Sequence, residues 1–253
     1  MDLTEFCTTV VPEAETTALR RKCHFMQGLR FDLGPVGNPV DMSLPVAVGS
    51  GGVELLGDLD VPPSASGLVV FAHGTGSSRF SPRNRLVARV LRDHGFATLL
   101  LDLLTDAEER QDLQTREFRF DIGLLADRVL SALDRMREHL EVRGLPVGLF
   151  GASTGAAAAL VAAAGDESVR AVVSRGGRPD LAGDALRDVE APTLMIVGGR
   201  DSRILDANRL ASRELRAPHR IVVIPGATHL FEEAGALERV AGLATAWFEQ
   251  NLS

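Results

Sequence analysis

Residues 146–155 of this 253-residue chain read PVGLFGASTG, and an alanine-rich run follows them through Ala164. The apolar residues 147–150 are typical of a short buried strand, and residues 156–164 are typical of a helix. Between them lies the pattern Gly-x-Ser-x-Gly with Ser153 at its centre, a turn so tight that only small residues fit beside the serine. Such a turn raises the serine hydroxyl above the edge of a sheet, where the first N–H groups of the helix point. The stretch therefore predicts a strand–turn–helix unit that presents Ser153 as a nucleophile.

Strand-like and helix-like segments alternate along the rest of the chain. Short apolar segments that predict strands occupy residues 44–48, 53–56, 68–72, 96–101, 169–173, 193–197 and 221–224. Helices are predicted from Ser81-Pro82 to Gly95, over 206–215 and 237–248, and along the apolar stripe Ile122, Ala126, Val129, Leu133, Met136 and Leu140. This alternation predicts a doubly wound, mostly parallel sheet covered on both faces. The GSGG turn at residues 49–52 predicts an antiparallel hairpin before it.

The chain is expected to hold one large domain. Residues 1–41 show no regular hydrophobic spacing and end near the turn-rich sequence GPVGNP, which suggests an extension outside the catalytic domain. Residues 42–253 are enough for one α/β domain with a substantial core, and they contain no internal repeat. Met42 opens this ordinary domain and is an alternative translation start.

The composition excludes several classes of protein. A formal net charge of -7 argues against a nucleic-acid-binding surface, which needs a basic excess. No apolar run approaches the ~18 residues of a membrane-spanning helix, and the first residues do not have the pattern of a signal peptide. Cys7 and Cys23 indicate neither a disulfide scaffold nor a metal site. We therefore expect a cytoplasmic protein with no nucleic-acid or membrane partner and no metal or other cofactor, while its oligomeric state stays open.

Two further side chains follow strands in the order that a serine nucleophile requires. The serine hydroxyl needs a neutral imidazole to take its proton and a carboxylate to hold that imidazole in one tautomer. Asp201 and His229 each come a few residues after a predicted strand, at the edge where parallel strands end. The order Ser153, Asp201, His229 is the one expected of an elbow-type hydrolase. Asp102, which ends a strand, and Asp206, which lies close by, are alternatives to Asp201.

An oxyanion site needs two backbone N–H donors beside the nucleophile. The Thr154 amide directly follows Ser153, and the loop HGTG at residues 73–76 follows an early strand, as the motif requires. We favour Thr75 for the second donor, with Gly76 as the alternative. His73 is expected to hold this loop rather than to act as a second base. The remaining histidines belong to no such constellation and are expected at the surface or at helix ends: His24, His94, His139 and His219.

Four motifs together resemble a known family. They are HGTGSSR at residues 73–79, GASTG at 151–155, GRD at 199–201 and GATHLF at 226–231. Over residues 42–250 they resemble the dienelactone-hydrolase-like branch of the α/β-hydrolases, which implies the α/β-hydrolase fold. Ser153 stands where dienelactone hydrolases have a cysteine nucleophile, so a substrate other than dienelactone is expected. Residues 77–79 and 175–180 resemble a subgroup that is often fused to a phosphoribosyltransferase domain, and no such domain is expected within this sequence.

The same resemblance bears on access to the site. Lids in this fold are commonly inserted after the strand that follows the elbow, and here only residues 174–192 separate that strand from the next. We therefore expect no large lid and an open pocket, which suits small or water-soluble esters. The charged residues 105–119 are the best candidate for its rim.

Substrate-binding residues are also expected at the strand ends. Gly76 is one candidate, and Arg79, Arg175 and Arg178 are others, because a guanidinium group binds a carboxylate bidentately. The alternative is that these arginines pair with acidic loop residues: Asp102, Asp106, Glu108 or Asp180.

The sequence thus predicts a serine carboxylic ester hydrolase acting on a small-molecule ester or lactone. Ser153 attacks, His229 moves the proton, Asp201 orients His229, and the Thr75 and Thr154 amides hold the oxyanion. Thioesterase, acyltransferase and peptidase action use the same groups and stay open. A catalytically idle scaffold that binds a ligand or a partner protein is a further alternative, although it has no physical need for all three groups.

Overall fold

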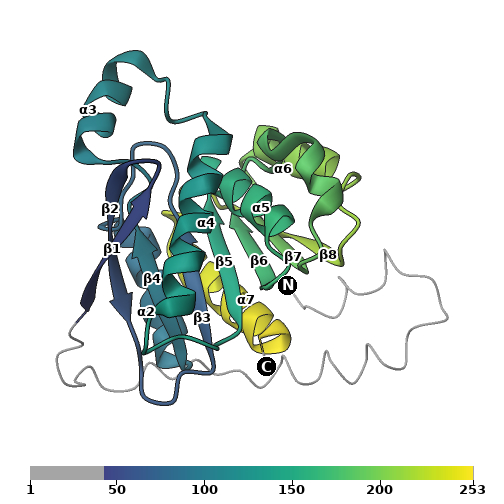
Figure 1. Cartoon of the computed structure of the whole chain (residues 1–253). Coiled ribbons are helices and arrows are strands. Elements are labelled where there is room, and N and C mark those ends of the chain that lie inside the picture. Colours follow the sequence, from purple (N-terminus) through teal and green to yellow (C-terminus); the bar gives the residue numbers. More distant parts are fainter. Residues whose placement is uncertain (1–42, 253) are drawn as a thin grey trace. The chain divides into compact units, whose positions relative to one another are not determined.

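A computed structural model describes residues 43–252, so the extension predicted for residues 1–41, Met42 and both cysteines lie outside the described residues. The described part contains one sheet with the strand order β1-β2-β4-β3-β5-β6-β7-β8 (Figure 1). Its strands are β1 (Leu44–Ser50), β2 (Val53–Asp60), β3 (Gly67–Ala72), β4 (Phe96–Leu101), β5 (Val147–Ala152), β6 (Val169–Arg175), β7 (Thr193–Gly198) and β8 (His219–Ile224). Strand β2 is antiparallel to both β1 and β4, and all other neighbours are parallel. The predicted mostly parallel sheet with an N-terminal hairpin is confirmed.

Helices cover both faces of this sheet (Figure 1). They are α2 (Pro82–Asp93), α3 (Asp106–Thr115), α4 (Ile122–Glu138), α5 (Thr154–Gly165), the 3₁₀ segment η3 (Pro179–Asp188), α6 (Ser202–Ala211) and α7 (Ala236–Asn251). One apolar core lies under α4, α5 and η3, and a second lies under α2 and α7. Side chains of β3 alternate between the two cores, because successive residues of a strand point to opposite faces.

Helix α5 consists mostly of residues with small side chains, since seven of its twelve residues are alanine. Nine of its twelve residues are buried, including the run Ala156–Ala159. It packs against α4 on one side and η3 on the other. A helix that is apolar all round is stable only where it is covered all round. The alanine-rich run therefore fixes α5 in the centre of one helical layer, directly behind the turn at Ser153.

Local sequence signals explain most element boundaries. Ser81 caps α2 by accepting a hydrogen bond from the Asn84 amide at 3.4 Å, and Pro82 occupies the first helical position. The predicted helix over residues 206–215 is shifted, because α6 starts at Ser202 after the N-cap Asp201. The stripe predicted through Leu140 is too long: α4 ends at Glu138, and Leu140 is 74% exposed.

The β6–β7 connection has no room for a large lid. It consists of residues 176–192 and carries only η3. The single tryptophan, Trp247, lies in α7 and donates its Nε1–H to the Pro192 carbonyl at 3.3 Å, so α7 is fastened to the end of this connection. Among the described residues, no helix combines the length and the apolar character that crossing a bilayer would need.

Candidate active site

Ser153 lies at the sharp turn between β5 and α5. Its backbone has φ 52° and ψ -121°, a positive φ that a residue with a side chain rarely adopts. Two hydrogen bonds hold this strained conformation: the Ser153 amide donates to the Arg175 carbonyl at 3.2 Å, and the Arg178 amide donates to the Ser153 carbonyl at 3.0 Å. Strain of this kind persists only where its surroundings enforce it, and it is concentrated at functional sites.

The glycines on either side of Ser153 are required by close packing. A Cβ atom on Gly151 would lie 2.4 Å from the Ala156 Cα atom. A Cβ atom on Gly155 would lie 2.3 Å from the Ala72 carbonyl oxygen. Both distances are far inside van der Waals contact, so the helix can approach the strand only with glycine at these positions.

His229 and Asp201 are joined by a hydrogen bond. His229 Nδ1 lies 2.7 Å from Asp201 Oδ2, and the side chains are 38% and 16% exposed. Asp201 is the N-cap residue of α6, yet its carboxylate accepts no capping hydrogen bond from that helix. The carboxylate is instead directed to His229. With Nδ1–H donated to the carboxylate, Nε2 is the nitrogen left to accept a proton.

Hydrogen bonds from backbone amides fix the two loops that carry this pair. The Arg200 amide donates to the Ala227 carbonyl at 2.9 Å, which ties the loop after β7 to the loop after β8. Glu233 accepts from the Thr228 amide at 3.0 and 3.1 Å, immediately before His229. Within the described residues, no hydrogen bond joins the Ser153 hydroxyl to His229.

The two alternatives to Asp201 are engaged elsewhere. Asp102 accepts from the Arg79 backbone amide at 2.7 Å and forms an ion pair with the Arg79 side chain. Asp206 is exposed and pairs with Arg209 along α6 at 3.3 Å. Of the three carboxylates considered, only Asp201 forms a hydrogen bond with His229.

The loop after β3 lies directly against Ser153. A Cβ atom on Gly74 would lie 2.8 Å from the Ser153 Cβ atom. The Thr75 amide donates to Thr154 Oγ1 at 3.1 Å, and the two threonine hydroxyls are also 3.1 Å apart. The Thr75 N–H is therefore already in use. Among the described residues, the Gly76 amide has no hydrogen-bond acceptor.

His73 connects this loop to the start of the segment that carries α3. Its Nδ1–H donates to the Gly74 carbonyl at 3.0 Å, and its Nε2 accepts from the Leu103 amide at 2.9 Å. Burial lowers the pKa of His73, and the hydrogen bond to Gly74 and the charge of Asp102 offset only part of this effect. Because both nitrogens of the neutral imidazole form hydrogen bonds within the protein, His73 stabilises the loop and does not act as a base, as the sequence predicts.

The three arginines at strand ends have different surroundings. Arg79 forms ion pairs with Asp102 and, at 3.4 Å, with Asp58, and Arg178 binds Asp180 through both Nε and Nη2. These pairs favour the loop-holding alternative over substrate binding for Arg79 and Arg178.

Arg175 has no carboxylate partner among the described residues, and its Nη2 donates to the neutral Asn84 Oδ1 at 3.2 Å. Burial, and then the charge of Arg83, lower the pKa of Arg175 to about 10.

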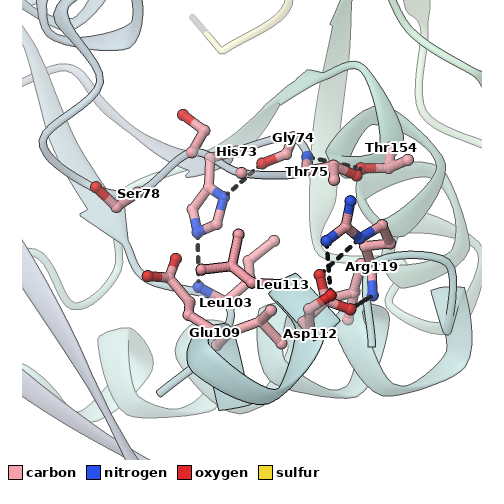
Figure 2. Close-up of a pocket in the computed structure, with 14 residues that line it drawn as sticks. His73, Gly74, Thr75, Ser78, Leu103, Glu109, Asp112, Leu113, Arg119 and Thr154 are labelled. Atoms are coloured by element: carbon pink, nitrogen blue, oxygen red, sulfur yellow. Dashed lines mark hydrogen bonds and ion pairs between the residues drawn. The ribbon is translucent and has the colours of Figure 1, made fainter. Parts of the chain in front are cut away.

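A cavity of about 290 Å³ opens beside Thr154 (Figure 2). One wall is the loop of residues 73–78, including Gly76, which is proposed below as the oxyanion loop, and the opposite wall is the segment from Leu103 to Arg119. The stretch 105–119 is expected at the rim, and four of its residues line the cavity: the charged Glu109, Asp112 and Arg119, and Leu113. Neither Arg79 nor Arg175 lines it. No three potential metal ligands cluster within residues 43–252.

Several lining residues were not identified from the sequence. The sequence assigns no role to Ser77 and Ser78 within the motif at residues 73–79. It also does not distinguish Glu109 and Asp112 from the other charged residues of the stretch 105–119. Helix α3 has no apolar face, since Asp112 is its one buried residue. Without such a face the sequence has no signal for which side of α3 turns toward the site.

A sequence profile of the Dienelactone hydrolase family matches residues 57–250. The chain belongs to the dienelactone hydrolase family. This confirms the resemblance seen in the motifs and the predicted α/β-hydrolase fold.

Similar proteins extend this assignment. A crystal structure of a dienelactone hydrolase from Anabaena variabilis is 56% identical, with a TM-score of 0.81, and the match covers 83% of this chain and 98% of that one. An esterase domain from Rhodothermus marinus shares the fold at 19% identity, with a TM-score of 0.64 and coverage of 83% and 99%.

A protein of Mycobacterium tuberculosis, provisionally named a phosphoribosyl transferase, is 56% identical over 208 residues. The match covers 82% of this chain, which spans only 46% of that relative's length.

Proposed function

We propose that this family member is a serine hydrolase that cleaves a small carboxylic ester or lactone through an acyl-enzyme. The observation that carries the proposal is the 2.7 Å hydrogen bond between His229 and Asp201, at the same edge of the sheet as Ser153. Ser153 is half-buried in a strained turn, and the cavity is lined not by Ser153 itself but by the next residue, Thr154. These are the parts that acyl transfer requires.

The steps follow from the roles of these groups. His229 Nε2 takes the hydroxyl proton as Ser153 Oγ attacks the ester carbon, and the Asp201 carboxylate stabilises the imidazolium that forms. Collapse of the tetrahedral intermediate breaks the bond to the alcohol oxygen, which receives the proton from His229. Water then attacks the acyl-enzyme, again with His229 as base, and releases the acid and free Ser153.

The proposed oxyanion donors are the Thr154 and Thr75 amides. For Thr75 the role has a condition, because its N–H donates to Thr154 Oγ1 at 3.1 Å. A substrate oxygen must replace or share this hydroxyl acceptor. Gly76, whose amide has no acceptor among the described residues, is the alternative donor. Losing one such donor typically costs ~10²–10³ in rate.

The cavity limits the size of the substrate. Ligand pockets commonly enclose ~300–1,000 Å³, so a volume of about 290 Å³ suits a small acyl or alcohol group. The β6–β7 connection of residues 176–192 adds no large cover. Short esters and lactones are therefore better candidates than long-chain lipids.

A fluorophosphonate probe tests the nucleophile directly. The wild-type protein should be labelled at Ser153, and Ser153→Ala should lose both the label and the hydrolysis of 4-nitrophenyl butyrate. Ser66→Ala is the matched control, because Ser66 is exposed, lies outside the cavity and should leave labelling unchanged. A folded wild type that is neither labelled nor active would instead support an idle scaffold.

A pair of histidine variants tests the base. His229→Ala should lose most of the ester hydrolysis, because Ser153 then has no imidazole beside it to take its proton. His219→Ala is the matched control, because His219 is exposed at the start of β8 and should leave the rate unchanged. Full activity of a folded His229→Ala protein would remove this histidine from the role of general base.

A further inference from the structure

The cavity beside Thr154 contains a carboxylate that has no ionic partner. Glu109 lines the cavity, and within residues 43–252 its side chain forms no ion pair or hydrogen bond. Its acidic neighbours differ from it. Glu108 binds Arg128 at 2.5 Å, and Asp112 binds Arg119 at 2.7 Å. Glu109 is thus the lining carboxylate left free to meet a ligand.

The position of Glu109 separates it from the one cation of the cavity wall. Figure 2 shows Glu109 on the side below His73 and Ser78, with its carboxylate turned away from Arg119. The Arg119 guanidinium is already used, since Nε donates to Asp112 Oδ2 and Nη2 donates to the Asp112 carbonyl, each at 2.7 Å. No cation of the wall therefore neutralises Glu109.

The electrostatic surroundings of Glu109 disfavour further negative charge. Burial raises the pKa of Glu109, and the charges of Asp102, Asp106 and Asp112 raise it further. A ligand that brings a carboxylate into this cavity would add repulsion to that cost. A ligand that brings an N–H or O–H donor would relieve it.

The rest of the wall favours an aliphatic stem. The cavity is lined by four leucines: Leu103, Leu104, Leu113 and Leu125. Hydroxyl groups of the oxyanion loop, from Thr75, Ser77 and Ser78, lie on the other side. A short methylene chain ending in a hydrogen-bond donor matches both surfaces.

We propose that Glu109 is a specificity-determining residue that selects esters whose acyl or alcohol part ends in an ammonium or hydroxyl group and rejects those ending in a carboxylate. The inference rests on the proposed ester hydrolysis at Ser153. It differs from the expectation of arginine-bound anionic substrates, because Arg79 and Arg178 are paired with carboxylates and Arg175 does not line the cavity.

Two matched series of esters test the selection. The first consists of 4-nitrophenyl esters of 6-aminohexanoic, 6-hydroxyhexanoic, hexanoic and adipic acids. The second carries the same four end groups on the alcohol of a butyrate ester. In the series that enters the cavity, kcat/KM should fall from the amino to the carboxylate end group by roughly 10- to 100-fold.

Variants assign the selection to Glu109. Glu109→Gln keeps an acceptor but removes the charge, so the amino-to-carboxylate ratio should fall about tenfold or more while the hydroxyl ester is nearly unaffected. Glu117→Gln is the matched control, because Glu117 is an exposed acid of the same segment that does not line the cavity. It should leave the ratio unchanged.

Binding of the isolated end groups keeps the two proposals apart. Hexylamine, 1-hexanol and hexanoate are titrated calorimetrically into wild type and Glu109→Gln, a readout that needs no turnover. Glu109-dependent preference for the amine without any ester hydrolysis would contradict only the proposed function. Hydrolysis with equal rates for the amino and carboxylate esters, or a ratio unchanged in Glu109→Gln, would overturn the role of Glu109.

Discussion

Helices α5 and α3 both border the candidate site, and they are held in opposite ways. Helix α5 begins at Thr154, next to Ser153, and buries nine of its twelve residues. Helix α3 forms the opposite wall of the cavity and buries only Asp112. The first is positioned by packing against the sheet, α4 and η3. The second is positioned by hydrogen bonds and ion pairs, chiefly those of Glu108 and Asp112.

The two ways of holding a helix match the two roles proposed at this site. The proposed nucleophile Ser153 precedes the closely packed α5, and the proposed specificity residue Glu109 lies in the polar-anchored α3. Close packing tolerates no displacement, which suits the nucleophile and the oxyanion donor proposed at Ser153 and Thr154. Polar attachments are less sensitive to shape but depend on charge and pH. We therefore expect substitutions that change volume to act through α5, and changes of charge or pH to act through α3.

The largest effect is expected at Gly155. A methyl group there would lie 2.3 Å from the Ala72 carbonyl oxygen and 2.4 Å from that of His73, and both are backbone atoms that cannot move aside alone. Gly155→Ala should lower the free energy of unfolding by more than about 3 kcal/mol, as measured by urea denaturation.

Gly165→Ala is the matched control at the other end of α5. Its new methyl group would meet only Leu130 Cδ1, at 3.8 Å, which is ordinary contact. This variant should be as stable as wild type, or up to about 1 kcal/mol more stable, because alanine favours the helix. Similar stabilities for the two variants would show that α5 is not held by close approach to β3.

The next effect is expected at Arg128, the main anchor of α3. Its side chain is only 3% exposed, and it donates to the Leu103 carbonyl at 2.5 Å and to both carboxylate oxygens of Glu108. Arg128→Met should cost about 3 kcal/mol, because it leaves a partly buried carboxylate and a carbonyl unpaired. Hydrogen exchange should show the lost protection mainly in residues 103–121.

Arg137→Met is the matched control, because Arg137 is an exposed arginine of α4, the helix that also carries Arg128. Arg137 pairs with Asp134 and Asp166, and its side chain is 44% exposed. The loss should stay below about 1 kcal/mol and should not reach α3. Equal losses in the two variants would contradict the anchoring role of Arg128.

Acid should loosen α3 before α5. Burial alone would raise the pKa of Glu108 and of Asp112, but hydrogen bonds from Arg128 and Thr105 to the first, and from Arg119 and Phe118 to the second, hold both pKa values below the ordinary ones. Their stabilising contribution is therefore complete above the unfolded-state pKa values of 4.5 and 3.8. It is lost as the pH falls through the lower folded-state values.

Hydrogen exchange corrected for its intrinsic pH dependence measures this order. Amides of α3 should lose protection below about pH 4, while those of α5 keep theirs. Asp112→Asn should weaken the pH dependence, whereas the exposed Asp134→Asn should not. Simultaneous loss in both helices would place their stability in one cooperative unit.

The smallest effect is expected at the N-cap of α3. Thr105 Oγ1 accepts from the Glu108 amide at 3.3 Å, and Glu108 Oε2 accepts from the Thr105 amide at 2.8 Å, which together form a capping box. Thr105→Ala should cost about 1 kcal/mol. Thr115→Ala, at the exposed C-terminal end of the same helix, should cost less than about 0.5 kcal/mol. Equal losses of unfolding free energy in the two variants would show that the Thr105 capping box does not stabilise α3.

The sequence predicts the strands, the helices that pack on them and the strand-end residues better than it predicts the ion pairs and hydrogen bonds between loops. Strand β4 has the bounds predicted for it, because a run of apolar residues between Gly95 and Asp102 has one reading. The order of Ser153, Asp201 and His229 places them after β5, β7 and β8, since strand ends and turn residues leave clear local signals. In α6 the predicted start is four residues late, because Asp201, which the sequence assigns to the site, is also the N-cap residue of this helix.

The ion pairs and hydrogen bonds that hold the loops and α3 join segments that are distant in the sequence. Arg79 meets Asp102 across two loops, and Arg128 meets Glu108 across two helices. No periodicity marks which charged residue is paired and which, like Glu109, is free. The occupied Thr75 amide is of the same kind, because its acceptor Thr154 lies on another element.

The fold carries its own optical probe for separating these events. Trp247 is the single indole of the chain, and α7 places it over the core beneath α2 and α7, with its Nε1–H on the Pro192 carbonyl. Its emission should therefore follow the melting of the sheet and stay constant while α3 detaches. Tryptophan fluorescence and amide exchange, recorded on the same unlabelled sample, would then follow the melting of the sheet and the detachment of α3 independently.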